Sequence, residues 1–80
     1  MDLALGGRVV LVTGGVRGGG AGISAVFAAQ GALVVTCARR PVDGLPYEFH
    51  SCDVRDPDAV GAMVDAVVER HGRLDVVVNN

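Results

Sequence analysis

Short runs of apolar residues recur along the 80-residue chain and are separated by turns or by segments with helical spacing. Arg8–Thr13 and Leu33–Ala38 are continuous runs rich in valine, which is typical of strands buried on both faces. Leu74–Val78 has the same character, and Tyr47–Cys52 has a weaker form of it. The pattern therefore predicts four strands.

The segment between the first two runs predicts a helix over Ala21–Gln30, which ends at Gly31. Spacings of three and four residues place several of its side chains on one face. The residues expected to pack on the sheet are Ile23, Val26, Phe27 and Gln30.

A second helix is predicted between the third and fourth runs. Asp56 is a good N-cap, Pro57 suits the first helical position, and Gly72 ends the helix. Its predicted buried face consists of Val60, Met63, Val64, Val67 and Val68.

Strands that alternate with helices predict an α/β fold, a Rossmann-type doubly wound parallel sheet. Arg39–Pro46 contains two prolines and a glycine and predicts a loop. Both faces of a parallel sheet need cover, and two helices are too few for four strands. We therefore expect residues 1–80 to be the N-terminal part of one incomplete domain. The isolated chain should aggregate or be partly unfolded.

Composition narrows the class of protein. Half of the residues are hydrophobic and the net charge is -2, so the chain lacks the basic footprint of a nucleic-acid-binding domain. The apolar run Ala25–Val35 is interrupted by Gln30 and Gly31 and is too short to span a membrane. A soluble cytoplasmic protein is expected. Cys37 and Cys52 lack metal-ligand spacing, which favours buried free thiols over a disulfide.

The most informative stretch is the glycine-rich loop between the first strand and the first helix. Five of the 12 glycines lie between Gly14 and Gly20. Such a loop lets backbone N–H groups approach a phosphate at a helix N-terminus. A P-loop is excluded because the chain has no lysine. A G-x-G-x-x-G/A register starting at Gly20 would fall inside the helix. The register Thr13-Gly14-x-x-x-Gly18-x-Gly20 fits better, and a glycine-rich turn without a ligand is the alternative.

Four segments resemble the short-chain dehydrogenase/reductase family. TGGVRGGGAGIS is similar to its TGxxxGxG cofactor turn, and CARR follows the second strand as in that family. CDVRDPDAV follows the third strand, and Asn79-Asn80 resembles the start of the NNAG motif. All four occur in the family's order and spacing.

The resemblance implies that Gly14, Gly18 and Gly20 cradle the pyrophosphate of a dinucleotide. Gly19 stands in the same turn, at a position where the family usually has Ile or Leu. A third consecutive glycine should make this loop more flexible.

The same resemblance assigns roles after the third and fourth strands. Asp53 would accept a hydrogen bond from the adenine amino group, and Val54 would touch the ring. Asn80 would lie near the adenosine ribose, and Asn79 would mainly tie neighbouring strands together.

The residues after the second strand bear on the choice between NAD and NADP. NAD-binding Rossmann folds have an acidic residue there to bind the ribose 2′-hydroxyl. Here the position holds Ala38, followed by Arg39 and Arg40, with Arg17 nearby in the glycine loop. Guanidinium groups suit a 2′-phosphate, so we favour NADP over NAD. A solvated basic turn is the alternative.

The resemblance implies a parent enzyme that transfers hydride between nicotinamide and a small carbonyl or alcohol substrate. It also implies that the parent enzyme can form a homo-oligomer. The family's Tyr-x-x-x-Lys motif has no match, because Tyr47 is followed by Ser51 four residues later. His50 and His71 stand alone, and no metal site is expected. We therefore expect no catalytic residue and no activity in this chain. A stand-alone nucleotide-binding or interaction module is the alternative.

Overall fold

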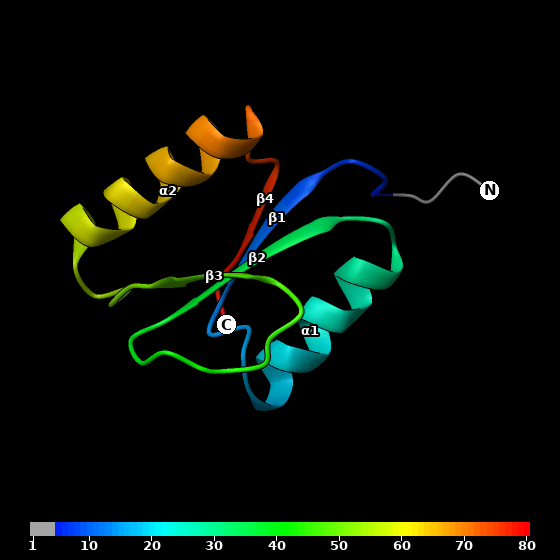
Figure 1. Cartoon of the computed structure of the whole chain (residues 1–80), viewed down its shortest axis with the longest axis horizontal. Coiled ribbons are helices and arrows are strands. Elements are labelled where there is room, and N and C mark those ends of the chain that lie inside the picture. The colour runs from blue at the N-terminus through cyan, green and yellow to red at the C-terminus, as the bar shows by residue number, and fades with distance from the viewer. Residues whose placement is uncertain (1–4) are drawn as a thin grey trace.

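The computed structural model describes residues 5–80, which form one parallel sheet and two helices (Figure 1). The strands are β1 (Val9–Thr13), β2 (Leu33–Ala38), β3 (Glu48–Ser51) and β4 (Val76–Val78), and the helices are α1 (Gly18–Ala29) and α2 (Pro57–His71). The order across the sheet is β3-β2-β1-β4, and all neighbouring strands run parallel. This confirms the predicted Rossmann-type α/β architecture.

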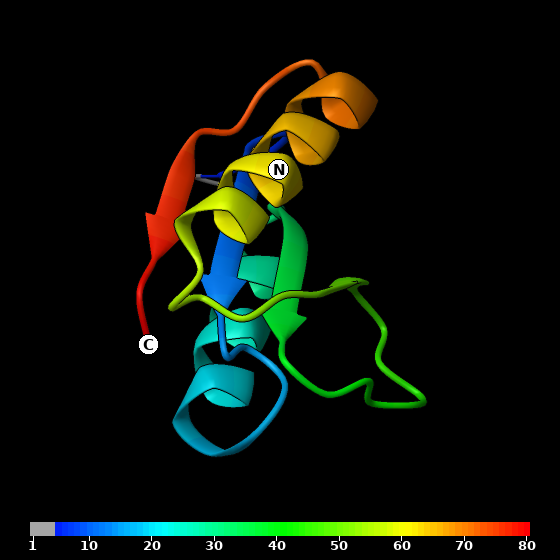
Figure 2. The same ribbon diagram turned by 90° about the vertical axis from the view of Figure 1, so that its left-hand side faces the viewer.

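The two helices lie on opposite faces of the sheet (Figures 1 and 2). Val9 and Leu11 of β1 face α2, where they pack with Met63 and Val67. The alternate residues of β1 face α1, where they pack with Ile23 and Phe27. Because β1 is covered on both faces, all five of its residues are buried.

Helix α1 begins at Gly18, three residues before the predicted start, so the loop is shorter than expected. Gly20 and Ser24, one turn apart, are its buried residues and fix which face meets the sheet. That face continues through Ile23 and Phe27. The prediction that Val26 belongs to it was wrong, since Val26 is 63% exposed. Gln30, also placed on that face, is the exposed C-cap.

Helix α2 has the predicted ends. The Asp56 side chain accepts hydrogen bonds from the backbone N–H groups of Asp58 (3.0 Å) and Ala59 (3.3 Å). Gly72 adopts the left-handed conformation with φ of 77° and ends the helix. Met63 and Val67 are buried as expected. The helix touches the sheet over a narrower stripe than predicted.

Val68 was placed on the buried face of α2, and this was wrong because its side chain is 41% exposed. Leu33 and Val77 of the sheet are exposed to 41% and 52%. The two helices therefore leave apolar parts of the sheet uncovered. β4 forms one edge of the sheet. Within residues 5–80, no helix has the length and apolar character needed to cross a membrane.

The sequence had suggested that the two histidines stand alone, and this was wrong. His50 and His71 both hydrogen-bond the carboxylate of Glu48, at 2.8 and 2.9 Å, and Arg70 lies 3.3 Å from it. Burial raises the pKa of Glu48, but the bonds from His50 and His71 outweigh it and hold that pKa below its ordinary value. This cluster joins β3 to the end of α2.

Asp75 attaches the start of β4 to β1. Its Oδ2 accepts a hydrogen bond from the Val9 backbone N–H at 2.8 Å. Its own backbone N–H donates to the Val9 carbonyl at 2.9 Å. Arg73 donates to both carboxylate oxygens. The hydrogen bond from Arg73, followed by that from Val9, lowers the pKa of Asp75 to about 2.

This attachment predicts that stability depends on pH. The pKa of Asp75 falls from an ordinary 3.8 to about 2 on folding, so its contribution is complete above 3.8 and is lost as the pH falls through about 2. We expect the Asp75→Asn variant to have a lower urea midpoint than the unaltered chain at about pH 6. That gap should close between about pH 4 and pH 2. Asp65→Asn, on the exposed side of α2, is the control, and a gap for Asp75→Asn that persists at about pH 2 would contradict the link.

Candidate functional site

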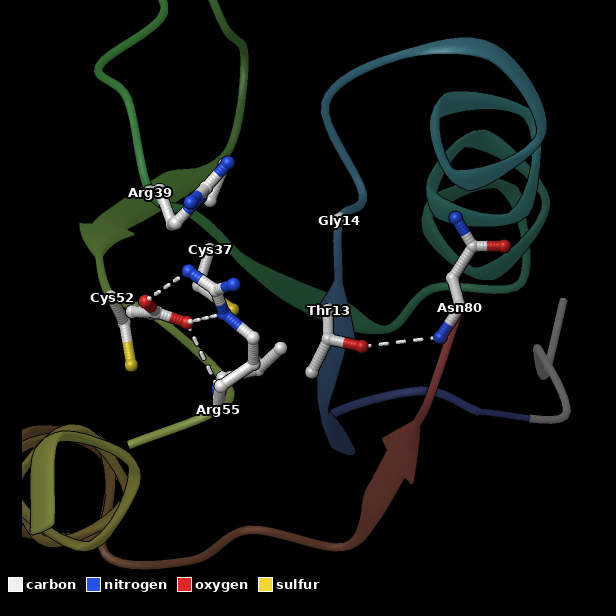
Figure 3. Close-up of a pocket in the computed structure, with 10 residues that line it drawn as sticks. Thr13, Gly14, Cys37, Arg39, Cys52, Arg55 and Asn80 are labelled. Atoms are coloured by element: carbon white, nitrogen blue, oxygen red, sulfur yellow. Dashed lines mark hydrogen bonds and ion pairs between the residues drawn. The ribbon is translucent and has the colours of Figure 1, made fainter. Parts of the chain in front are cut away.

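The carboxyl ends of the parallel strands meet at one edge of the sheet and surround a cavity of about 410 Å³ (Figure 3). Thr13 and Gly14 line it from β1, and Ala38 lines it from the end of β2. Asp53 follows β3 and Asn80 follows β4. Ligands of doubly wound α/β folds bind at this edge. The structure thus brings sequence-predicted residues from four strands together.

The glycine loop can adopt its path only with glycine at particular positions. Gly14 and Gly18 have φ of 65° and 53°, which is the left-handed region that other residues rarely adopt. A Cβ on Gly20 would collide with the Gly14 carbonyl and lie 2.7 Å from Asn80 Nδ2. These three glycines are the ones singled out by the sequence. The backbone of α1 therefore comes very close to the end of β1.

Gly15 is a fourth required glycine that the motif did not single out. A Cβ there would lie 2.6 Å from Ser24 Oγ and 2.9 Å from Thr36 Cγ2. The Ser24 hydroxyl also donates a hydrogen bond of 3.0 Å to the Gly15 carbonyl. Gly15 therefore lets α1 pack directly on the loop.

Gly19 differs from its neighbours. It lies in the first turn of α1, its φ is not in the left-handed region, and nothing lies within 4 Å of a Cβ built on it. It therefore belongs to the helix, and not to a flexible loop as the sequence had suggested. No packing constraint requires a glycine at this position.

The start of α1 has the features of an anion site. Its N-cap residue, Arg17, is extended and makes no side-chain hydrogen bond to the helix, and the first turn contains no acidic residue. In α2, by contrast, Asp56 caps the helix and Asp58 lies in the first turn. The first backbone N–H groups of α1 thus lack a capping side chain, and the helix dipole favours a negative charge there.

The glycine geometry predicts opposite effects for two neighbouring substitutions. Gly20→Ala should destabilise the fold by about 1–3 kcal/mol, because the new methyl group has no space. Gly19→Ala is the matched control and should stabilise it by about 0.5–1 kcal/mol, because alanine is the better helix former. Urea unfolding of both variants measures this. Equal effects of the two would show that α1 does not approach Gly14 as closely as described.

Asp53 is held by a neighbouring arginine. Arg55 donates to Asp53 from Nε (3.0 Å), from a terminal guanidinium nitrogen (2.9 Å) and from its backbone N–H (3.0 Å). These bonds, with the positive charge of Arg39 as a smaller cause, lower the pKa of Asp53 to about 2. Val54, between them, is 53% exposed and lines the cavity. Both of these sequence-predicted residues therefore lie in the cavity.

Asn80 lines the cavity, and its backbone takes part in the link between β4 and β1. The Asn80 backbone N–H donates to Thr13 Oγ1 at 3.1 Å (Figure 3). Thr13 Oγ1 in turn donates to the Val78 carbonyl at 3.2 Å. Within residues 5–80, Thr13 and Asn80 therefore tie β4 to β1 here. Asn79, which had been assigned that role, is exposed.

A second cavity, of about 190 Å³, adjoins the first one and shares Ala38 and Arg39 with it. Arg17 from the glycine loop and Arg40 also line it. The other four arginines each pair with a carboxylate. Within residues 5–80, Arg17, Arg39 and Arg40 form no such pair. The structure thus gathers the three uncompensated guanidinium groups at one place.

The larger cavity is also lined by three residues that the motifs did not identify, Cys37, Cys52 and Arg55. Both cysteines are buried free thiols, and burial raises the pKa of Cys37. Cys37 precedes Ala38 at the end of β2, and Cys52 directly precedes Asp53. The position of the two cysteines at strand ends was the one sequence signal that could have placed them in the cavity. Each cysteine also fitted the pattern of an ordinary core residue.

Residues 8–80 match the family described as short chain dehydrogenase. The chain belongs to the short-chain dehydrogenase family. It is 43% identical over 81 residues to L-fucose dehydrogenase of Bos taurus, an alignment that covers 92% of this chain and 30% of that protein. It is 34% identical over 90 residues to D-threitol dehydrogenase of Mycolicibacterium smegmatis, covering 99% of this chain and 35% of that protein.

Solved structures agree with this assignment. Ligand-free aldohexose dehydrogenase of Thermoplasma acidophilum matches with a TM-score of 0.92 and 32% identity, over 100% of this chain and 31% of that one. A metagenomic short-chain oxidoreductase in complex with NADP matches with a TM-score of 0.85 and 39% identity, over 95% of this chain and 39% of that one. The chain thus spans about a third of the length of the proteins that it matches.

The family binds NAD or NADP, and the cavity offers the chemistry that such a cofactor needs. Close-packed glycines and an uncapped helix N-terminus suit a pyrophosphate. A carboxylate that lines the cavity, that of Asp53, suits an adenine amino group. A cavity lined by three arginines suits a further phosphate.

Proposed function

We propose that this chain is the N-terminal, cofactor-binding part of an NADP(H)-dependent short-chain dehydrogenase, and that residues 1–80 belong to one Rossmann domain. The observation that carries the proposal is a group of arginines that, within residues 5–80, have no acidic partner and lie next to the strand-end cavity. Arg17, Arg39 and Arg40 line a cavity of about 190 Å³, and no carboxylate lines it. An NAD-selective site would place a carboxylate there.

The adenosine half of the cofactor is assigned to the cavity of about 410 Å³. Asp53 would accept a hydrogen bond from the adenine amino group, and Val54 would contact the ring. Asn80 would lie beside the ribose; its backbone is fixed by Thr13. These roles fit the positions of the side chains, because all of them line one cavity.

The pyrophosphate is assigned to the turn between β1 and α1. Gly14, Gly18, Gly19 and Gly20 would present backbone N–H groups without intervening side chains. The uncapped start of α1 adds the positive end of the helix dipole. The contribution of Gly19 here would be its backbone N–H group. Its conformation and surroundings would also accept a residue with a side chain.

The 2′-phosphate is assigned to the arginine-lined cavity. Arg39 lines both cavities, so it stands between the site for the ribose and the site for the phosphate. Arg17 reaches the same cavity from the glycine loop, and Arg40 from the turn after β2. Ion pairing with a dianionic phosphate would satisfy guanidinium groups that have no acidic partner within residues 5–80.

When bound, the nicotinamide of such a cofactor donates or accepts a hydride. The residues of this chain would hold and orient the adenosine and phosphate groups. We assign no catalytic or metal-binding role to any of them. In the whole protein, a carbonyl or alcohol would be the substrate. Membership of a dehydrogenase family favours this function over a stand-alone interaction module.

The arginine cavity predicts a selective effect of Arg39→Ala. Adenosine 2′,5′-bisphosphate and AMP differ by the 2′-phosphate alone. We expect the substitution to weaken binding of the bisphosphate by about 10- to 100-fold, as a charged hydrogen bond is worth about 1.5–3 kcal/mol. Binding of AMP should change less than about twofold. Titration calorimetry on the whole protein that contains residues 1–80 measures both.

Arg70→Ala is the control, because it also removes an exposed positive charge but from a residue of α2 that lines neither of these two cavities. It should leave both affinities unchanged. Arg39→Glu should weaken NADP much more than NAD. Equal losses for the two ligands would exclude the 2′-phosphate role of Arg39. Failure of the unaltered whole protein to bind either nucleotide would exclude the cofactor site as a whole.

A further inference from the structure

Arg55 occupies a position that the family motifs leave without a role. It lies two residues after Asp53 and lines the same cavity of about 410 Å³. In Figure 3 its side chain extends from the loop after β3 toward the part of the cavity where Cys37 and Arg39 lie. Its side chain is 73% exposed. Packing alone therefore does not explain why it is held against Asp53.

The contact between Arg55 and Asp53 uses most of the acceptor capacity of the carboxylate. Oδ1 accepts from the Arg55 backbone N–H and from Nε, both at 3.0 Å. Oδ2 accepts from the terminal guanidinium nitrogen at 2.9 Å. An ionised carboxylate offers about four acceptor positions, so one position remains, on Oδ2. The carboxylate is therefore both fixed in orientation and open to a single further donor.

This arrangement has a chemical consequence for the base that binds. A carboxylate in this state can accept a hydrogen bond but cannot donate one. The amino group at position 6 of adenine donates, whereas the carbonyl oxygen at that position of hypoxanthine only accepts. Bound in the orientation in which adenine places its 6-amino group on Asp53 Oδ2, a base with a carbonyl at position 6 would put another acceptor there, which is unfavourable. To use its N1–H donor instead, such a base would have to shift in the cavity.

We propose that Arg55 is a positioning residue for base recognition: its guanidinium fork orients Asp53 so that the free Oδ2 acceptor selects a 6-amino purine over a 6-oxo purine. The proposal rests on the cofactor site proposed above and adds to it a residue that determines specificity. The fork geometry is essential, since the planar guanidinium can contact both carboxylate oxygens whereas the ammonium group of lysine acts as a point charge.

The chain contains a matched control for this fork. Arg73 and Asp75 are also two residues apart, and Arg73 also donates to both carboxylate oxygens. That pair attaches β4 to the start of β1, at the opposite edge of the sheet from the cavity. Loss of either fork removes one exposed guanidinium, but only the Arg55 fork lies at the proposed adenine site.

The test compares adenosine 2′,5′-bisphosphate with inosine 2′,5′-bisphosphate, which differ at position 6 of the base. Calorimetry on the whole protein that contains residues 1–80 gives the ratio of the two affinities. We expect the unaltered chain to prefer the adenosine ligand by about tenfold or more. Arg55→Gln should reduce this preference several-fold and leave the affinity for the inosine ligand within about twofold. Arg55→Lys should restore the preference only in part, and Arg73→Gln should leave it unchanged.

A double-mutant cycle tests whether Arg55 acts on base preference through Asp53. Asp53→Asn should abolish the preference, and adding Arg55→Gln to Asp53→Asn should have no further effect on it. Equal losses of both ligands in Arg55→Gln would overturn the proposal, because a purely structural role has that result. Tighter binding in Arg55→Gln would also overturn it, by showing that the guanidinium obstructs the cavity. Selectivity for the 2′-phosphate that depends on Arg39, without any effect of Arg55, would refute this inference and leave the cofactor site standing.

Discussion

The close approach of α1 to the carboxyl end of β1 is the constraint on which the rest of the structure depends. Gly20 has no space for a Cβ against the Gly14 carbonyl, and Gly15 has none against Ser24. This contact places the uncapped start of α1 beside the cavity between the strands. It also fixes the face of α1 that meets the sheet, which leaves Val26 in solvent. The close approach of α1 thus determines both how this helix packs on the sheet and where its start, to which we assign phosphate binding, lies.

The distribution of charge follows from the same geometry. At the edge of the sheet where β3 and β4 begin, carboxylates hold the elements together: Asp75 accepts a hydrogen bond from the Val9 backbone of β1, and Glu48 of β3 bonds His71 of α2. At the edge where the carboxyl ends of the strands meet, one cavity is lined by Arg17, Arg39 and Arg40. These arginines have no acidic partner within residues 5–80. Structural charges are therefore neutralised locally, while the positive charge that we assign to phosphate binding stays available.

The sequence alone determined the elements and most of the family motif. Valine-rich runs fit only strands covered on both faces, so β1 and β2 could be placed to within a residue. Asp56, Pro57 and Gly72 act locally, through capping and backbone conformation, so both ends of α2 were predictable. The order of the glycines, Asp53 and Asn80 along the chain was sufficient for the family, to which the chain belongs.

Contacts between residues distant in sequence were decided by the tertiary structure alone. The start of α1 at Gly18 depends on how closely two backbones approach, and helix propensity argued against three consecutive glycines there. Glu48 brings His50 and His71 together, although the two histidines are 21 positions apart in the sequence. Arg55 reads as an ordinary surface residue until its side chain is seen against Asp53. Periodicity reports which face of an element is buried, whereas only the folded chain shows which side chains meet across an edge of the sheet.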